Sequence, residues 1–203
     1  PGHGLYKGIK ELKPGHYMNV SSGSKKEEQY WELTASEHVD DFETTVAKTR
    51  DILLDAIKRQ LVSDVPLCTF LSGGVDSSAI TAIAAQEIKN LHTFSIDYED
   101  NVKYFKKTAF TVSQDNDFIK LISDLNQTHH HYCVISNQDL ADALKDAVYF
   151  RDMPGMADVD SSLYWFCKKI KEDYTVSLSG ECADEIFGGY PWFYREPMNG
   201  MFP

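Results

Sequence analysis

Phe70-Leu71-Ser72-Gly73-Gly74-Val75-Asp76-Ser77-Ser78 is the stretch on which the fold of this 203-residue chain depends. It follows an apolar run, residues 65–71, and it precedes a helical pattern that begins near Ser78. Two glycines let the backbone turn sharply and approach a ligand closely. The free N–H groups at the start of the next helix favour an anion. Hydroxyl donors and a carboxylate that can reach a divalent metal follow in the same loop, at Ser72, Ser77, Ser78 and Asp76. The stretch therefore predicts a polyphosphate-binding loop.

This loop has two alternative interpretations. It is not a Walker-A loop, because the Gly-Lys-Ser/Thr ending is missing. A plain Gly-Gly turn with a Ser/Asp helix cap would also follow a strand and precede a helix. All the polar residues that a phosphate loop needs are present, so we favour the phosphate loop.

The composition is that of a globular protein, with 42% hydrophobic and 25% charged residues. No apolar run approaches the ~18 residues of a membrane span, so no membrane association is expected. A net charge of −11 argues against a nucleic-acid partner. The four cysteines are scattered without a Cys-x-x-Cys pair, which disfavours a zinc site or disulfides and fits a reducing, cytoplasmic location. Three of them, Cys68, Cys133 and Cys167, lie in apolar patterns and are expected to be buried.

Two regions differ in pattern. Residues 1–35 contain short extended pieces at 5–9, 16–20 and 30–33, too few to bury a core of their own. Residues 36–203 alternate between helical and strand patterns, beginning with a helix capped by Ser36. Strands are expected at 65–71, 91–98, 130–135 and 175–178, and helices after the loop, from about Asp115, and over the apolar stripes at 140–148 and 163–170. The alternation predicts an α/β fold with a mostly parallel sheet, covered on both faces and preceded by a few short β-strands.

A second polar segment follows the last predicted strand: Ser179-Gly180-Glu181-Cys182-Ala183-Asp184-Glu185-Ile186-Phe187-Gly188-Gly189-Tyr190. Because the carboxyl ends of parallel strands meet at one rim, it is expected beside the first loop. Two carboxylates, Asp76 and Asp184, would then form a magnesium site together with phosphate oxygens. For Glu185 alone, acidic capping of an ordinary helix is preferred.

The two segments together resemble a known family. The sequence of the first segment resembles the pyrophosphate-loop signature Ser-Gly-Gly-x-Asp-Ser of ATP pyrophosphatases. The second, about a hundred residues later, makes the chain similar to the synthetase domain of glutamine-hydrolysing asparagine synthetases. This resemblance implies a three-layer α/β/α, adenine-nucleotide alpha-hydrolase-like (Rossmann-like) fold for residues 36–203. It also implies that residues 1–35 are the end of a glutaminase domain and its linker.

The resemblance implies a role for each motif residue. Adenylation of the aspartate side-chain carboxylate by ATP, followed by ammonia attack, would give asparagine, AMP and pyrophosphate. The cofactor-binding residues implied are Leu71, Ser72, Gly73, Gly74, Asp76, Ser77, Ser78, Ile96, Ser179 and Gly180. The catalytic residues implied are Glu181, beside the acyl centre, and Asp184, which with Asp76 would bind Mg²⁺.

Three departures from the family pattern accompany the resemblance. Family members usually have glycine where Cys182 stands. The cysteine is either a benign difference, which we favour, or it narrows the pocket beside Glu181. No cysteine precedes Cys68, so a glutaminase nucleophile is lacking and ammonia would come from a domain absent here. The chain ends soon after Tyr190, whereas the family continues with a helical region that carries a catalytic lysine. We therefore expect an excised piece that is inactive alone, whose apolar end at 192–194 would let two copies associate as a homodimer.

Two other functions fit the same residues. One is a nucleotide-binding module without turnover, and the other is a related ligase that forms β-lactams or modifies peptides or glycans. A tRNA-modifying pyrophosphatase is disfavoured by the acidic charge. The loop 151–160 either lines the substrate site, with Arg151 on a carboxylate, or is a solvated acidic loop. Strand alternation separates His130 from His129 and His131, which disfavours a three-histidine metal site. The lysines at 103, 106 and 107 are expected to lie on a solvated surface.

Overall fold

A computed structural model describes residues 2–104 and 115–193 of the chain. The chain divides into two compact units, residues 1–46 and 47–203. The helix α1 (Phe42–Gln60) runs across this division. The two units are described separately below.

The first unit contains one β-hairpin. Strands β1 (His16–Ser21) and β2 (Ser24–Gln29) pair antiparallel around a two-residue turn at Ser22 and Gly23, where Gly23 has a φ of +80°. The expectation of a strand at 16–20 is confirmed, whereas the extended pieces expected at 5–9 and 30–33 form no strand. The sequence of β2, SKKEEQ, has no apolar alternation because nearly all of its side chains are exposed, so its pattern carried no strand signal.

Helix α1 begins at Phe42, and the start expected at Ser36 is wrong. The carboxylate of Asp41 accepts a hydrogen bond from Thr44 N at 2.8 Å, and Thr45 N donates to Asp41 O at 2.9 Å. Asp41 therefore caps the helix. Residues 36–39 have no regular secondary structure.

The second unit is built on a four-stranded parallel sheet with the strand order β5-β4-β3-β6. Its strands are β3 (Leu67–Phe70), β4 (His92–Tyr98), β5 (His129–Ile135) and β6 (Val176–Leu178). The helices between them are α2 (Val75–Glu87), α3 (Asn101–Tyr104), α4 (Asn116–Asn126), α5 (Asn137–Arg151) and α6 (Ala157–Ile170). Two short helical pieces, α7 (Ala183–Phe187) and the 3-10 turn η1 (Pro191–Phe193), follow β6. The expected α/β fold, with a parallel sheet flanked by helices and preceded by short strands, is confirmed.

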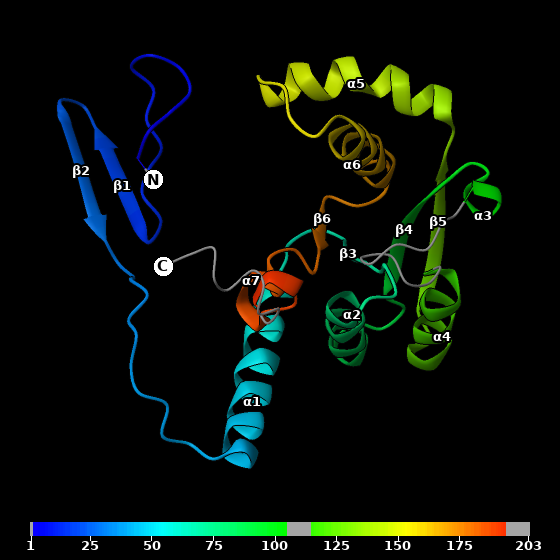
Figure 1. Cartoon of the computed structure of the whole chain (residues 1–203), viewed down its shortest axis with the longest axis horizontal. Helices are drawn as coiled ribbons and strands as arrows, with labels where there is room; N and C mark the ends of the chain where they lie inside the picture. Colours follow the sequence, from blue (N-terminus) through cyan, green and yellow to red (C-terminus); the bar gives the residue numbers. More distant parts are fainter. Residues whose placement is uncertain (1, 105–114, 194–203) are drawn as a thin grey trace. The chain divides into compact units, whose positions relative to one another are not determined.

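Helices cover both faces of the sheet (Figure 1). On one face, Ala84 of α2 packs with Leu67, Leu91 and Leu178. On the other, Phe166 and Ile170 of α6 pack with Cys68 and Phe94, and Phe70 meets Phe166 with ring centroids 4.9 Å apart. Helix α4 shares the face of α2, and α5 packs on α6. These layers place α2 and α6 on opposite sides of β3.

The apolar stripe on α6 is narrower than its sequence pattern predicts. Phe166 and Ile170 are buried, but Cys167 is exposed and Leu163 is 50% exposed. The expectation that Cys167 is buried is therefore wrong, because only the side of the helix around Phe166 and Ile170 faces the sheet. Cys68 is fully buried and Cys133 half-buried. Within the described residues, no helix is long and apolar enough to cross a membrane.

The histidines of β5 alternate as expected. His130 faces the side of α2 and α4, where its two ring nitrogens lie 2.8 Å from Thr93 Oγ1 and 2.9 Å from Ser95 Oγ. His131 lies on the other face, with its Nε2 2.8 Å from His92 Nδ1 and its ring stacked on Phe94. Among the described residues, no group of three or more His, Cys, Asp and Glu side chains is placed to hold a metal ion.

We predict that stability falls with acidification because of His130. Burial, with a smaller contribution from His131, lowers the pKa of His130 to about 4. The unfolded chain, with a histidine pKa of ~6.5, then takes up a proton that the folded chain does not, so stability is lost as pH falls from about 6.5 to about 4. The slope is at most about 1.4 kcal/mol per pH unit, and less for a ring that is only partly buried.

Urea unfolding between pH 7.5 and 4.5 measures this slope. Burial, then the neighbouring His131 and His129, also lowers the pKa of His92, so a residual slope of the same sign is expected in His130→Gln. His3→Gln, at an exposed position, serves as the control. An unchanged slope in His130→Gln contradicts the prediction.

Candidate nucleotide-binding site

The site lies where the chain reverses its direction across the sheet. From β3 the chain proceeds outward to β4 and β5, and it then returns to place β6 on the opposite side of β3. In open parallel sheets ligands bind beyond the carboxyl ends of the strands at such a switch point. The segments after β3 and β6 are the two predicted motifs, Ser72–Ser78 and Ser179–Tyr190. The sheet topology therefore brings both motifs to the switch point.

The two motifs touch at Gly180. A Cβ added to Gly180 would lie 3.1 Å from Asp76 Cβ and 3.2 Å from Ser77 N. Parallel pairing of β3 with β6, which sets Thr69 opposite Leu178, fixes this approach. Gly180 is thus a point where only hydrogen fits easily between the end of β6 and the first turn of α2.

The first loop presents backbone donors. Helix α2 starts at Val75, and its first intrahelical bond runs from Ser78 N to Gly74 O at 3.0 Å. The N–H groups of the preceding three residues point out of the helix start, and Gly74 supplies no side-chain cap. At the start of a 13-residue helix these N–H groups form a site for an anion such as phosphate.

Ser77 holds the loop closed. Its side chain is buried, and its Oγ accepts from Ser72 N at 3.1 Å and lies 2.9 Å from Ser72 Oγ. Ser77 Oγ also donates to Gly74 O at 3.3 Å. In this structure the Ser77 hydroxyl therefore shapes the loop, whereas Ser72 is exposed at its mouth and Ser78 is half-buried in the first turn.

The two residues predicted to line the adenosine pocket flank this loop. Leu71 is fully buried, and its N–H donates to Phe94 O at 2.9 Å, so the N–H itself is engaged. Ile96 is half-buried on β4, the strand next to β3, opposite Cys133 of β5. Both lie on the strands beside the switch point.

The second motif forms a short acidic turn. Ser179 Oγ accepts from Glu181 N at 3.5 Å, and Ala183 N donates to Gly180 O at 3.3 Å. Glu181 is exposed and Asp184 is half-buried at the start of α7. The negative charges of Glu185, Asp184 and Glu181 raise the pKa of Tyr190, whose hydroxyl lies 3.4 Å from Glu185 Oε1. The three carboxylates and the phenol are therefore close neighbours.

Two carboxylates could hold a magnesium ion here. The side chain of Asp76 begins beside Gly180, and Asp184 follows Gly180 by four residues in a tight turn. Magnesium is usually bound in proteins by one or two carboxylates together with phosphate oxygens and water. This donor set fits the ion only together with a polyphosphate.

The loop at 151–160 is closed by an ion pair. Arg151 pairs with Asp160, whose side chain is only 13% exposed, and both groups lie against Gly155. This pair occupies the Arg151 guanidinium, which the sequence left open for a substrate carboxylate. Of the predicted lysine cluster, Lys103 is exposed, whereas 106 and 107 lie outside the described residues.

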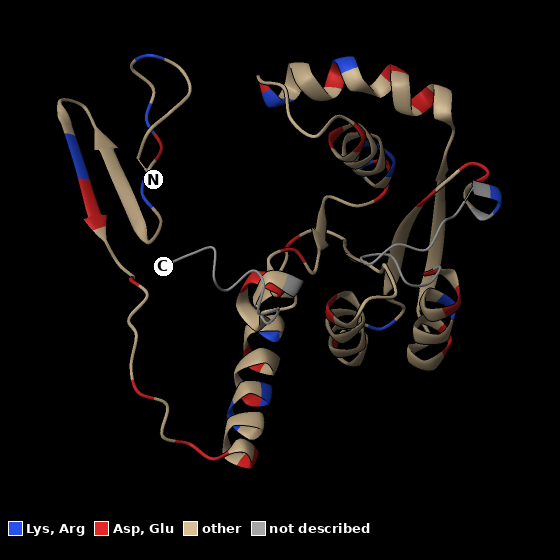
Figure 2. Cartoon of the chain, viewed as in Figure 1, with Lys and Arg blue, Asp and Glu red and all other residues tan. Residues whose placement is uncertain are grey.

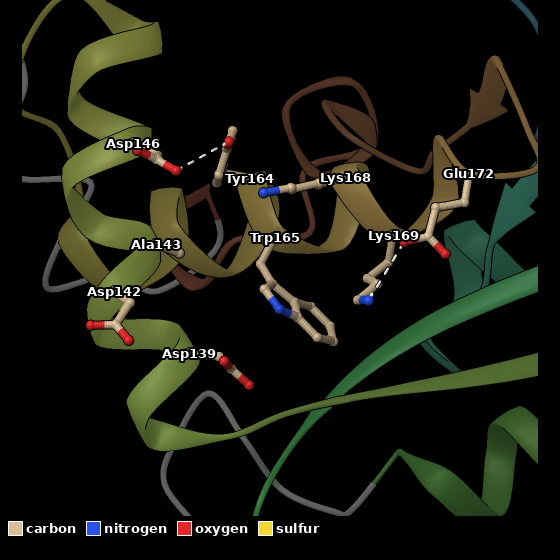
Figure 3. A pocket seen from close by; sticks show the side chains of 9 residues that line it. All are labelled: Asp139, Asp142, Ala143, Asp146, Tyr164, Trp165, Lys168, Lys169 and Glu172. Carbon is tan, nitrogen blue, oxygen red and sulfur yellow. Dashed lines mark hydrogen bonds and ion pairs between the residues drawn. The ribbon is translucent and has the colours of Figure 1, made fainter.

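A groove of about 270 Å³ lies elsewhere, between α5 and α6 (Figure 3). Asp139, Asp142 and Asp146 line its α5 side, opposite Trp165 and the lysines of α6. Lys169 pairs with Glu172 at 3.5 Å and lies 5.8 Å from the Trp165 ring centre. Three carboxylates would repel a polyphosphate, and none of the predicted nucleotide residues lines the groove. The switch point is therefore the better candidate for the nucleotide.

Sequence reasoning omitted Asp97, a polar residue at the carboxyl end of β4. Its Oδ1 accepts from Asn101 Nδ2 at 2.7 Å, and its Oδ2 accepts from Asn116 Nδ2 at 3.1 Å. An acidic residue at the carboxyl end of a strand next to the phosphate-loop strand is the signal that could have identified it.

Comparisons with known proteins show the family of the chain. The family model described as asparagine synthase matches residues 48–203. The chain belongs to the asparagine synthase family. Over its whole length it is 54% identical to asparagine synthetase [glutamine-hydrolyzing] 3 of Bacillus subtilis, of which it covers 34%. It is 32% identical to asparagine synthetase [glutamine-hydrolyzing] 1 of the same organism, with 94% of the chain and 29% of the relative covered. It is 29% identical to asparagine synthetase B of Escherichia coli, with 93% and 35% covered. The chain thus spans about a third of the length of these relatives.

The backbone explains one departure from the family pattern. Cys182 has a φ of +68°, the left-handed conformation in which glycine alone is unstrained. A side chain there costs about 1 kcal/mol relative to glycine. The substitution is thus tolerated at a small cost in stability.

We predict that Cys182→Gly raises the free energy of unfolding by about 1 kcal/mol, because it removes this strain. Cys182→Ala is the matched control, since it removes the thiol and keeps the strain. Urea unfolding monitored by circular dichroism measures both. Equal stability of Cys182→Gly and Cys182→Ala would contradict the assignment of strain to this residue.

We predict that Gly180→Ala weakens binding of Mg·ATP about tenfold. The added methyl group would displace the first turn of α2 by a few tenths of an ångström where the phosphates would bind. Isothermal titration calorimetry measures the affinity, and Ser177→Ala, at an exposed position of the preceding strand β6, is the control. Wild-type affinity in a folded Gly180→Ala protein would remove Gly180 from the site.

Proposed function

We propose that the chain carries the ATP-binding and amide-forming site of an asparagine-forming ligase. In this reaction the side-chain carboxylate of aspartate is adenylated, and ammonia then displaces AMP to give asparagine and pyrophosphate. The observation that carries the proposal is the contact between the two motif-bearing segments at the switch point, made through Gly180 and the first turn of α2. Membership of the asparagine synthase family supports the same chemistry.

The first loop binds the triphosphate of ATP. Backbone N–H groups at the start of α2, with Ser72 and Ser78, contact the phosphates, and Ser77 keeps the loop in shape. Leu71 and Ile96 line the adenosine pocket. Ser179 and Gly180 contact the nucleotide from the end of β6. These contacts position the α-phosphorus for attack, which is the main contribution a protein makes to such a transfer.

Asp76 and Asp184 would hold a magnesium ion. Such an ion would supply positive charge to neutralise the pyrophosphate leaving group. The two carboxylates come from the two motifs, so the metal site would exist only where the motifs meet.

In this reaction two bonds form and two break. An aspartate carboxylate oxygen forms a bond to the α-phosphorus of ATP while the bond from that phosphorus to the pyrophosphate oxygen breaks. The nitrogen of ammonia then attacks the acyl carbon, and the bond from carbon to the AMP oxygen breaks. Glu181, exposed beside Ser179, accepts a proton from the attacking nitrogen.

The substrates are small molecules. The printed names of the relatives include glutamine hydrolysis, and we propose that ammonia reaches this site from a glutaminase domain of which residues 1–35 are the end. Helices α1, α4, α5 and α6 each carry acidic as well as basic residues (Figure 2), which supports small-molecule partners over nucleic acid. We also propose that the protein forms a homodimer and is cytoplasmic, and that the 203-residue chain alone binds its ligands without turnover.

Exchange of labelled pyrophosphate into ATP tests the reaction. The chain is assayed alone and as a chimera in which it replaces the matching region of the Bacillus subtilis relative. We expect aspartate- and magnesium-dependent exchange in the chimera. Absence of exchange in a folded chimera that binds ATP would contradict the proposal. Exchange with other carboxylic acids in place of aspartate would instead indicate a related ligase with another acceptor.

We predict that Asp76→Asn weakens the magnesium-dependent part of ATP binding at least tenfold, because it removes one of two carboxylate ligands. Binding of ATP without magnesium should change little. Asp64→Asn, an exposed acidic residue before β3, is the charge-matched control. Calorimetric titrations with and without magnesium separate the two contributions, and equal magnesium dependence in Asp76→Asn and wild type would remove Asp76 from the metal site.

A further inference from the structure

Asp97 connects two chain segments at the carboxyl end of β4. It lies on the face of the sheet that α2 and α4 cover, since Thr93 and Ser95, four and two residues earlier, face that side. Its Oδ1 accepts from Asn101 Nδ2 at 2.7 Å and from Tyr98 N at 2.8 Å. Its Oδ2 accepts from Asn116 Nδ2 at 3.1 Å. One carboxylate thus joins the start of α3 to the first residue of α4.

The first turn of α4 is in turn the outer wall of the pyrophosphate loop. Gly73 has a φ of +81°, and a Cβ added there would lie 2.9 Å from Asp115 O and 3.0 Å from Phe118 Cβ. A shift of the first turn of α4 would therefore change the space around Gly73 directly.

The charges exclude a direct phosphate-binding role for Asp97. A carboxylate near a polyphosphate site opposes the bound anion. Its three hydrogen-bond donors are neutral amides, so no cation cancels its charge through these bonds. Burial, and then the charge of Asp97, raise the pKa of Asp115, which places these two carboxyl groups close together at the wall of the loop. What Asp97 does contribute is a bridge, in which one carboxylate oxygen accepts from Asn101 and the other accepts from Asn116.

We propose that Asp97 is a positioning residue for nucleotide binding: through Asn116 it holds the first turn of α4 against Gly73 and so sets the shape of the pyrophosphate loop. The inference rests on the nucleotide site of the proposed function. It concerns ATP affinity and loop order, and it makes no use of the acceptor or of ammonia.

A reciprocal exchange of the two side chains tests this inference. Asp97→Asn places an amide nitrogen against the Asn116 amide, and Asn116→Asp places two carboxylates together. In the double variant the amide of residue 97 donates to the carboxylate of residue 116, while its oxygen still accepts from Asn101. Glu99→Gln, an exposed acidic residue two positions away, is the control for charge alone.

The two explanations predict opposite signs. If only charge matters, Asp97→Asn removes a negative charge near the phosphates and strengthens Mg·ATP binding, as does Glu99→Gln. If Asp97 positions the loop, Asp97→Asn weakens binding about threefold to tenfold and Asn116→Asp at least tenfold. The double variant should then return to within about twofold of wild type, because the hydrogen bond is restored.

Affinity is measured by calorimetry, and hydrogen exchange of the amides at 72–78 reports the loop itself. Faster exchange at 72–78 in both single variants, reversed in the double variant, is expected while the thermal midpoint of unfolding changes little. Additive losses in the double variant, or wild-type affinity and loop exchange in folded Asp97→Asn, would overturn the inference. If the double variant restores Mg·ATP binding but aspartate-dependent pyrophosphate exchange is absent, only the proposed function fails. If pyrophosphate exchange occurs but the double variant does not restore binding, only this inference fails.

Discussion

The parallel pairing of β6 with β3 is the constraint on which the site depends. It is only three residues long, from Leu67 opposite Val176 to Thr69 opposite Leu178, yet it fixes where the chain enters its second motif. With this register, the backbone at Gly180 reaches the side chain of Asp76 and the amide of Ser77. A shift of one residue would turn the β6 side chains to the opposite face and move Gly180 away from the helix start. The hundred residues between the motifs serve to bring β6 back to this position.

The loop after β3 is shaped by both local and distant contacts. Locally, the buried Ser77 hydroxyl ties Ser72 to the start of α2. From farther along the chain, the first turn of α4 packs on Gly73, and Gly180, two residues after β6, packs on Asp76. The backbone donors at the helix start are therefore held from three directions before any ligand arrives, which lowers the ordering cost of binding. An anion-binding loop of this kind needs little movement to receive phosphate.

Sequence alone predicted the layers of the second unit and the meeting of its two motifs, because strand and helix patterns are strong where one face is buried. Leu67, Phe94 and Ile135 are buried core residues in strands that the sequence predicted. The sequence pattern failed where burial was weak. The charged strand β2 has no apolar face, and α1 is capped by Asp41, five residues after the predicted cap at Ser36. The pattern also could not predict the left-handed backbone at Cys182, the ion pair of Arg151 with Asp160, or the bonds of Asp97, because each depends on distances between chain segments.

One nucleotide that contacts both motifs at the switch point should protect both of them from hydrogen exchange. Hydrogen exchange of the chain with and without Mg·ATP should therefore show residues 72–78 and 179–184 protected together, with the same dependence on nucleotide concentration. Protection of only one segment, or protection centred on the groove between α5 and α6, would contradict a shared nucleotide.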